Sequence, residues 1–251
     1  MKNRKSNTSP LLKKLIPPGS VINSFLFFSA ELELEMIKNN CFVIARTTSY
    51  AVYEFWRCMQ TDPERVAAAT EYINSLVAEE KMFYYIQDKF MHYKDPFVRS
   101  AFFYLLSFYS DSGKVCSGKM IQRNERSLHL GLSRIKMFDV ENLHVKFDKD
   151  EKDFLATAHE SPDSEYLLIP AGEYSYNYFE DGVNLGFEET RVYHKKIKKF
   201  FDSTNHQCLL TYFRHSQVFK LYKDYNMTMI NEYGHVVENE EDCREVIVAN
   251  F

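Results

Sequence analysis

Two short apolar stretches decide the fold: Ser20-Val-Ile-Asn-Ser-Phe25 and Cys41-Phe-Val-Ile-Ala45. The segment between them places Leu32, Met36 and Ile37 at the spacing of one helical face. A strand, a helix and a second strand in this order predict a βαβ unit, in which a crossover helix joins two parallel strands. The chain is therefore expected to open with an α/β fold.

The C-terminal half continues this alternation of strands and helices. Residues 166–169 are a strand candidate that we expect to end at Pro170, and residues 189–201 have the pattern of a lysine-rich helix. Further strands are predicted over residues 207–213, 227–230 and 244–250. The fold class is therefore α/β, Rossmann-like, with a mainly parallel central sheet and an antiparallel edge near the C-terminus.

The middle of the chain has a different pattern. Helical spacing predominates from about residue 50 to residue 109, and residues 110–126 are polar and basic, which indicates a hairpin or loop. Helices are expected over residues 64–78, 82–93 and 97–109, the last one starting at Asp95-Pro96. We therefore expect a core made of residues 1–50 and 145–251, and an inserted helical lobe with a basic hairpin at residues 51–144.

Composition limits the kinds of function. The chain has 251 residues with 45% apolar and 26% charged, as in globular proteins, and its net charge of −4 leaves DNA binding to a local basic patch. The five cysteines include no CxxC pair, which argues against a disulfide framework or a zinc site. With no signal-peptide core and no stretch long enough to span a bilayer, we expect a cytoplasmic protein without a membrane partner.

The order of segments resembles the Dam-type DNA adenine methyltransferases of bacteria and phages. Ser9-Pro-Leu-Leu-Lys-Lys-Leu-Ile-Pro-Pro-Gly19 is similar to the family's opening stretch, and Asp95-Pro-Phe-Val-Arg-Ser-Ala-Phe-Phe-Tyr-Leu-Leu106 to its "DPFxRA…FLYLN" helix. Arg244-Glu-Val-Ile-Val-Ala-Asn-Phe251 looks like its closing strand. The resemblance covers nearly the whole chain and implies a methyltransferase fold with a DNA-recognition lobe.

The cofactor motifs of that family are altered here. The family's glycine-rich turn, which approaches S-adenosylmethionine, corresponds to Phe25-Leu-Phe-Phe-Ser-Ala30, which contains no glycine. The family's acidic residue, which accepts hydrogen bonds from the ribose, corresponds to Arg46. The family's N-terminal Lys-Trp-Gly-Gly-Lys motif is missing, because residues 3–8 read Asn-Arg-Lys-Ser-Asn-Thr. The degenerate pocket is expected to comprise Phe25, Phe27, Phe28, Ser29, Arg46 and Thr48.

The catalytic "DPPY" turn is altered as well. In the family it holds a flipped adenine by its amino group, while the aromatic ring stacks on the base. The corresponding stretch is Leu168-Ile-Pro-Ala-Gly-Glu-Tyr174, in which Ile169 or Ala171, depending on register, replaces the acceptor. The degenerate site therefore comprises Ile169, Pro170, Ala171, Gly172 and Tyr174. None of the histidines has metal-ligand spacing and no GxSxG elbow occurs, so we expect neither a metal nor a hydrolase triad.

Basic residues at the expected hairpin are the candidates for DNA contact: Lys114, Lys119, Arg123, Arg126, Arg134 and Lys136. The family's "NRYGYNG" stretch reads Ser107-Phe-Tyr-Ser-Asp-Ser-Gly113 here, so sequence-specific reading is not implied. Backbone contact and a solvated loop are equally good interpretations.

Three hypotheses follow. The leading one is a pseudo-methyltransferase without cofactor that binds duplex DNA, a protein partner or another copy of itself, encoded by a phage or mobile element. The second is a divergent, active methyltransferase that uses S-adenosylmethionine. The third is a viral structural or anti-defence protein that does not bind DNA and would work in the host cytoplasm.

Overall fold

The computed structural model describes residues 6–111, 113, 115, 116, 118–148, 154–162, 165–172, 174 and 193–251. The chain divides into two compact units. An α/β unit is formed within residues 5–48, 142–177 and 191–251, and a helical unit by residues 49–141. The helical unit is thus an insertion in the α/β unit, between its second and third strands.

An eight-stranded sheet forms the centre of the α/β unit, in the order β3-β2-β1-β4-β5-β8-β6-β7. The strands are β1 (Val21–Ser24), β2 (Phe42–Thr47), β3 (Leu143–Phe147), β4 (Tyr166–Gly172), β5 (Cys208–Phe213), β6 (Asn226–Ile230), β7 (Val236–Val237) and β8 (Glu245–Ala249). The first five strands of that order pair in parallel, which confirms the α/β class and the mainly parallel sheet.

The expected antiparallel edge is placed differently in the structure. Strand β8 lies inside the sheet, antiparallel to both β5 and β6, and the edge strand is the two-residue β7. All five residues of β8 are buried, so its continuous apolar run belongs to an interior strand rather than to an edge. The order of the strands along the chain does not reveal this position, because β8, the last strand in the sequence, pairs between the earlier strands β5 and β6.

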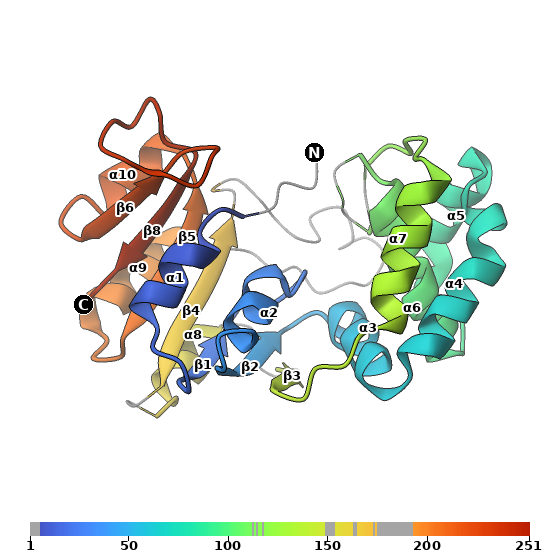
Figure 1. The fold of residues 1–251 in the computed structure, drawn as a ribbon, viewed down its shortest axis with the longest axis horizontal. Helices are drawn as coiled ribbons and strands as arrows, with labels where there is room; N and C mark the ends of the chain where they lie inside the picture. The colour runs from blue at the N-terminus through green and yellow to red at the C-terminus, as the bar shows by residue number, and fades with distance from the viewer. Residues whose placement is uncertain are drawn as a thin grey trace. The chain divides into compact units, whose positions relative to one another are not determined.

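Helices cover the sheet on two sides (Figure 1). They are α1 (Ser9–Leu15), α2 (Glu31–Ile37), α8 (Phe154–His159), α9 (His194–Ser203) and α10 (Ser216–Leu221). In the view of Figure 1, α1 and α2 lie in front of the strands and α8 and α9 behind them. The strand-helix-strand unit predicted from residues 20–45 is confirmed as β1-α2-β2 with parallel strands. Residues 189–192 of the predicted lysine-rich helix lie outside the described residues.

Strand β4 does not end at Pro170, as the sequence predicts, but continues to Gly172. Proline has no N–H to donate, and interior strands usually exclude it. The ladder with β5 becomes irregular here: Pro170 is opposite Thr211 and Gly172 is opposite Tyr212, with a shift between them. Such a bulge lets a strand continue past a residue that cannot complete the regular pattern.

The helical unit comprises α3 (Tyr50–Thr61), α4 (Pro63–Val77), α5 (Glu80–Lys89), a 3-10 turn (Phe90–His92), α6 (Pro96–Tyr109) and α7 (Glu125–Lys136). Helix α6 supplies its core, with Ala101, Phe102, Leu105 and Leu106 at most 2% exposed. Asp95 caps α6 by accepting hydrogen bonds from the N–H groups of Phe97 (2.8 Å) and Val98 (3.2 Å). The predicted helix start at Asp95-Pro96 is thereby confirmed.

Residues 110–126, predicted as a hairpin or loop, contain no helix or named strand before Glu125 among the described residues, and the helix that follows was not predicted. Among the described residues of this segment, a single bridge joins Ser110 to Met120. A helix, α7, begins at Glu125, and Asn124 caps it by accepting from the N–H of Arg126 at 2.8 Å. Its buried residues Leu128, Leu132 and Ile135 have helical spacing, and this spacing is the signal in the sequence that could have predicted α7.

Within the described residues, no helix is both long and apolar enough to cross a membrane.

Candidate functional site

The strand order of the α/β unit reverses between β1 and β4. The chain proceeds from β1 to β2 and β3 on one side and to β4 and β5 on the other. In open α/β sheets, ligands bind outside the carboxyl ends of the strands at such a switch point. The stretch after β1 lies beside β4, since the N–H of Phe25 donates to the carbonyl of Leu168 at 2.9 Å. Phe25 and Leu168 begin the two stretches that the resemblance aligns with the cofactor turn and the catalytic turn.

The turn after β1 adopts backbone conformations that favour glycine. Leu26 has φ of 56° and Ala30 has φ of 57°, both in the left-handed region. For a residue with a Cβ atom this conformation costs roughly 1–2 kcal/mol. The N–H of Phe27 donates to the carbonyl of Arg46 at 3.0 Å, so this amide is bonded to β2. The turn therefore has strained positions suited to glycine, but no glycine.

Aromatic side chains of this turn pack into the core. Phe25 is fully buried and Phe27 is 2% exposed, whereas Phe28 is half-buried and Ser29 is exposed. A buried Phe side chain is among the largest single contributions to core packing. The turn is thus fixed by its own side chains as well as by its backbone bonds.

Arg46, at the expected ribose-binding position, takes part in a polar chain across the sheet. Its Nη1 lies 2.9 Å from Oδ1 of Asp148, and its Nε donates to Oδ1 of Asn23 at 3.4 Å. The amide of Asn23 in turn donates to Glu165. Burial raises the pKa of Asp148 and the Arg46 charge opposes that rise. The guanidinium of Arg46 is therefore bonded to partners within the protein.

Thr48, also expected in the degenerate pocket, follows β2 and is half-buried.

A buried carboxyl group also lies near the carboxyl end of β1. Ser24, the last residue of β1, donates from its hydroxyl to Oε1 of Glu33 at 2.6 Å. Glu33 is 3% exposed, and burial raises its pKa. Sequence reasoning did not single out this pair, because acidic residues are almost never fully buried unless they have a partner.

At the stretch that the resemblance aligns with the "DPPY" turn, the described residues 169–172 supply no side-chain acceptor. Ile169 and Ala171 are fully buried in β4, and Pro170 and Gly172 carry no polar side-chain atom. Tyr174 stacks on two imidazole rings, that of His194 with ring centroids 4.1 Å apart and that of His215 at 4.6 Å. The stacking surface of Tyr174 is thus used within the protein.

His194 links this tyrosine to the interior. Its Nε2 lies 2.6 Å from the carbonyl oxygen of Tyr174, and its Nδ1 lies 3.1 Å from the hydroxyl of Tyr212. Because a carbonyl can only accept, Nε2 carries the proton and Nδ1 accepts from Tyr212. Burial lowers the pKa of His194 and raises those of Tyr212 and Tyr222, so burial favours the neutral form of each group. The sequence offered one signal, since His194 begins the buried stripe of α9.

The predicted DNA-contact residues of the helical unit have different environments. Lys119, Arg126 and Arg134 are exposed. Arg123 is half-buried: it donates to the carbonyl of Ser110 at 3.5 Å and lies over the Phe108 ring. Lys136 pairs with Glu71 at 2.8 Å. Arg126, Arg134 and Lys136 belong to α7 and not to a hairpin. Lys114 lies outside the described residues.

Exposed apolar side chains accompany the arginines of α7. Leu130, four residues from both Arg126 and Arg134, is 55% exposed, and Met137 just after the helix is 82% exposed. The outer side of α7 therefore combines positive charge with apolar surface.

No group of three His, Cys, Asp or Glu side chains in the described part of the chain is arranged to hold a metal ion. Comparison with known proteins adds no assignment: no protein-family model matches the chain, and no curated protein matches it either.

Proposed function

We propose that this chain is a methyltransferase-like protein that does not transfer methyl groups and acts as a binding module. The sheet supports the Rossmann-like part of that likeness, because its parallel strands follow the order 3-2-1-4-5 of the classic dinucleotide-binding sheet. The antiparallel strand β8, between β5 and β6, departs from that classic sheet. The helical unit lies between β2 and β3 in the chain, where the resemblance implies a recognition lobe.

The observation that carries the proposal is the turn after β1. Leu26 and Ala30 occupy left-handed positions without glycine, Phe27 is buried, and its N–H is bonded to Arg46. A cofactor turn needs backbone that a ligand can approach closely and donors that face the ligand. These residues do not fit S-adenosylmethionine in the manner that the resemblance implies.

The second argument concerns the adenine acceptor. Ile169 and Ala171 are apolar and buried, so neither can polarise an amino group. A divergent active enzyme would need an acceptor from elsewhere. Incubation with a labelled methyl donor and unmethylated duplex DNA separates the two hypotheses: we expect no label in the DNA, and enzymatic transfer above a heat-inactivated control would contradict the proposal.

Duplex DNA is the partner that the basic residues favour. Residues 110–137 contain six basic and two acidic side chains, while the whole chain is acidic. Among the described residues, Arg126 and Arg134 form no ion pair and are exposed on α7. Such charges bind phosphates without reading sequence, with an affinity that falls as salt rises.

Charge reversal on α7 is expected to weaken DNA binding. The double variant Arg126→Glu/Arg134→Glu should lower the affinity at least tenfold in a mobility-shift titration. It should also reduce the slope of log K against log salt by about two, because each phosphate contact contributes about 0.9. The matched control is Lys81→Glu/Lys89→Glu, which reverses two exposed lysines of α5. Equal affinities for both variants would contradict a DNA contact through α7.

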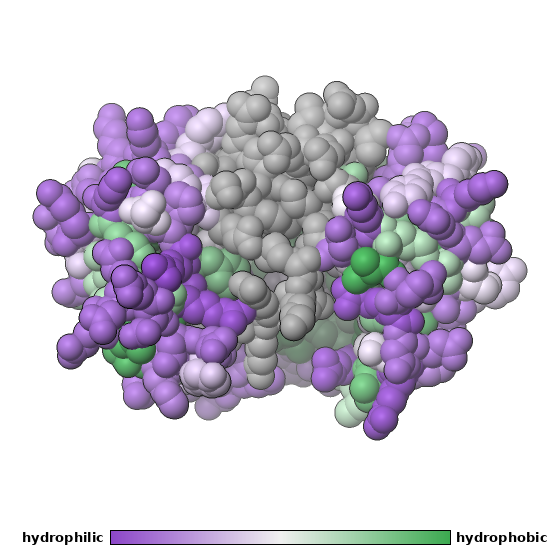
Figure 2. Space-filling model, turned by 90° about the horizontal axis from the view of Figure 1, so that it is seen from above, coloured by the Kyte–Doolittle hydropathy of each residue, from purple (hydrophilic) through white to green (hydrophobic). Residues whose placement is uncertain are grey.

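A protein partner is the second candidate, and the exposed Leu130 and Met137 favour it. Arginine and methionine are enriched in protein interfaces, whereas a phosphate backbone offers nothing to an apolar side chain. Figure 2 shows hydrophobic areas on the helical unit among hydrophilic residues. A protein that co-purifies with wild type but not with Leu130→Asp, together with no DNA affinity, would favour this candidate over DNA.

A further inference from the structure

Two carboxyl groups from distant parts of the α/β unit hold the first described residues. The N–H of Ser6 donates to Oε1 of Glu31 at 2.6 Å, and the Ser6 hydroxyl donates to Oε2 of Glu245 at 2.7 Å. The N–H of Asn7 lies 3.1 Å from each oxygen of Glu245. Thr8, which follows, is 1% exposed. This short segment is therefore bonded to the protein through its backbone and side chains.

The two carboxyl groups lie on either side of β4 in the sheet order. Glu31 is the first residue of α2 and follows the turn after β1. Glu245 is the first residue of β8 and pairs with Phe213, the last residue of β5. Because β4 lies between β1 and β5, a segment bonded to both carboxyl groups bridges the carboxyl edge at the switch point. That edge is where a sheet of this kind takes a ligand.

Burial makes the contact with Glu245 important for stability. Glu245 is 2% exposed, and its side-chain oxygens receive three hydrogen bonds from Ser6 and Asn7. A buried carboxyl group without hydrogen-bond donors costs folding free energy. Detachment of the segment would therefore be unfavourable unless water reached Glu245 and replaced the lost donors. In the family that the sequence resembles, the N-terminal segment carries a cofactor motif. Here its donors are used by the protein's own carboxyl groups.

We infer that Ser6, Asn7 and Thr8 form an intramolecular strap that closes the carboxyl edge of the sheet, with Glu245 as its anchor. This inference goes beyond the proposed function, because it concerns access to the edge and not the loss of methyl transfer. The chain's own segment thus stands at the edge where, in open α/β sheets, a ligand approaches.

Hydrogen exchange measured by mass spectrometry on the full chain tests the strap. Glu245→Ala should accelerate amide exchange at least tenfold in residues 6–12 and also in the turn at residues 26–31, whose last residue, Glu31, accepts a hydrogen bond from the Ser6 N–H. Exchange in β2 should stay unchanged and serves as the internal folding control. The matched control variant is Glu232→Ala, because Asn7 contacts the backbone carbonyl of Glu232 and not its side chain.

A second variant keeps the test decisive if Glu245→Ala unfolds the protein. Ser6→Ala/Asn7→Pro removes the Ser6 hydroxyl and the Asn7 N–H, the two donors whose hydrogen bonds Glu245 accepts. The carboxyl group of Glu245 stays in place. The strap predicts the same faster exchange in residues 6–12 and 26–31. Unchanged exchange in residues 6–12 in this variant would overturn the anchor, and faster exchange confined to residues 6–12 would overturn closure of the edge. Neither outcome bears on methyl transfer or cofactor binding, which are measured separately.

Discussion

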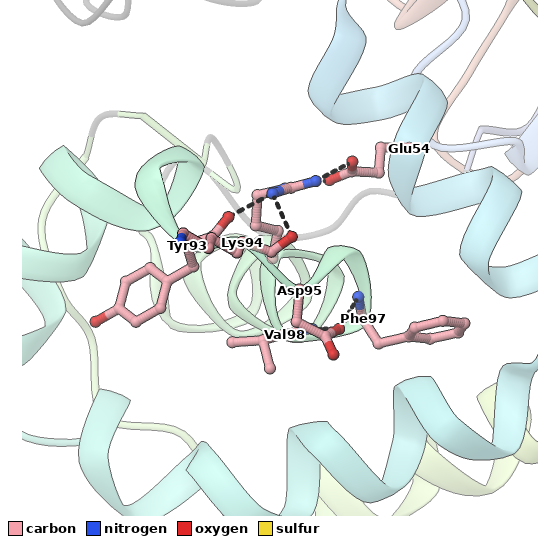
Figure 3. A network of polar contacts seen from close by, with 7 residues as sticks. Glu54, Tyr93, Lys94, Asp95, Phe97 and Val98 are labelled. Atoms are coloured by element: carbon pink, nitrogen blue, oxygen red, sulfur yellow. Dashed lines mark hydrogen bonds and ion pairs between the residues drawn. The ribbon is translucent and has the colours of Figure 1, made fainter.

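Arg99→Ala is expected to lower the unfolding free energy by about 3–5 kcal/mol, the usual cost of leaving one member of a buried ion pair alone. Arg99 on α6 donates from Nε to Oε2 of Glu54 on α3 at 2.6 Å, and its Nη2 contacts the other carboxylate oxygen. It also donates to the carbonyl groups of Tyr93 and Lys94 (Figure 3). The Glu54 side chain is 8% exposed and that of Arg99 is 16% exposed.

A matched arginine exists in the same unit. Arg65 pairs with Asp95 at 3.0 Å, but their side chains are 54% and 44% exposed. Exposed pairs contribute about 0–1 kcal/mol, so Arg65→Ala should change stability little. Urea unfolding followed by far-UV circular dichroism measures both variants. Similar losses for the two would show that the Arg99 pair does not join α3 to α6 as described.

Phe27→Ala is the second large effect that we expect. The side chain is 2% exposed, and truncation of a buried Phe costs about 3–5 kcal/mol through lost transfer energy and the cavity left behind. The neighbouring Phe28 is half-buried, so Phe28→Ala provides a matched control with a clearly smaller loss. Urea midpoints of both variants report the difference. A Phe27→Ala protein as stable as wild type would mean that this ring is not part of the core.

The fold was predictable where local pattern and tertiary role agree. The apolar runs and helical spacing of residues 20–45 predict β1, α2 and β2, because each element there buries one continuous face. Strand β3 was missed although Leu143 and Val145 alternate with exposed residues, since five residues give a weak signal. The position of β8 inside the sheet depends on pairing between distant segments, which no local pattern carries.

The candidate site was predictable in its residue types and not in its contacts. The missing glycines of the turn after β1 are visible in the sequence, but the left-handed conformation of Leu26 and Ala30 is not. The ring stack of Tyr174 on His194 and His215 joins residues up to 41 positions apart and follows from the packing of α9 and α10 against the sheet. The strap contacts of Glu245 depend on a partner more than two hundred residues away in the chain.

We propose above all that the turn after β1 does not accept S-adenosylmethionine. Isothermal titration calorimetry of the full chain with S-adenosylmethionine, and with S-adenosylhomocysteine as a second probe, tests it most directly. We predict no saturable heat up to millimolar ligand, because Phe27 is buried, its N–H is bonded to Arg46, and Leu26 and Ala30 stand at the left-handed positions. Saturable binding with a Kd of about 1 μM or tighter, equivalent to about −8 kcal/mol, would contradict the account.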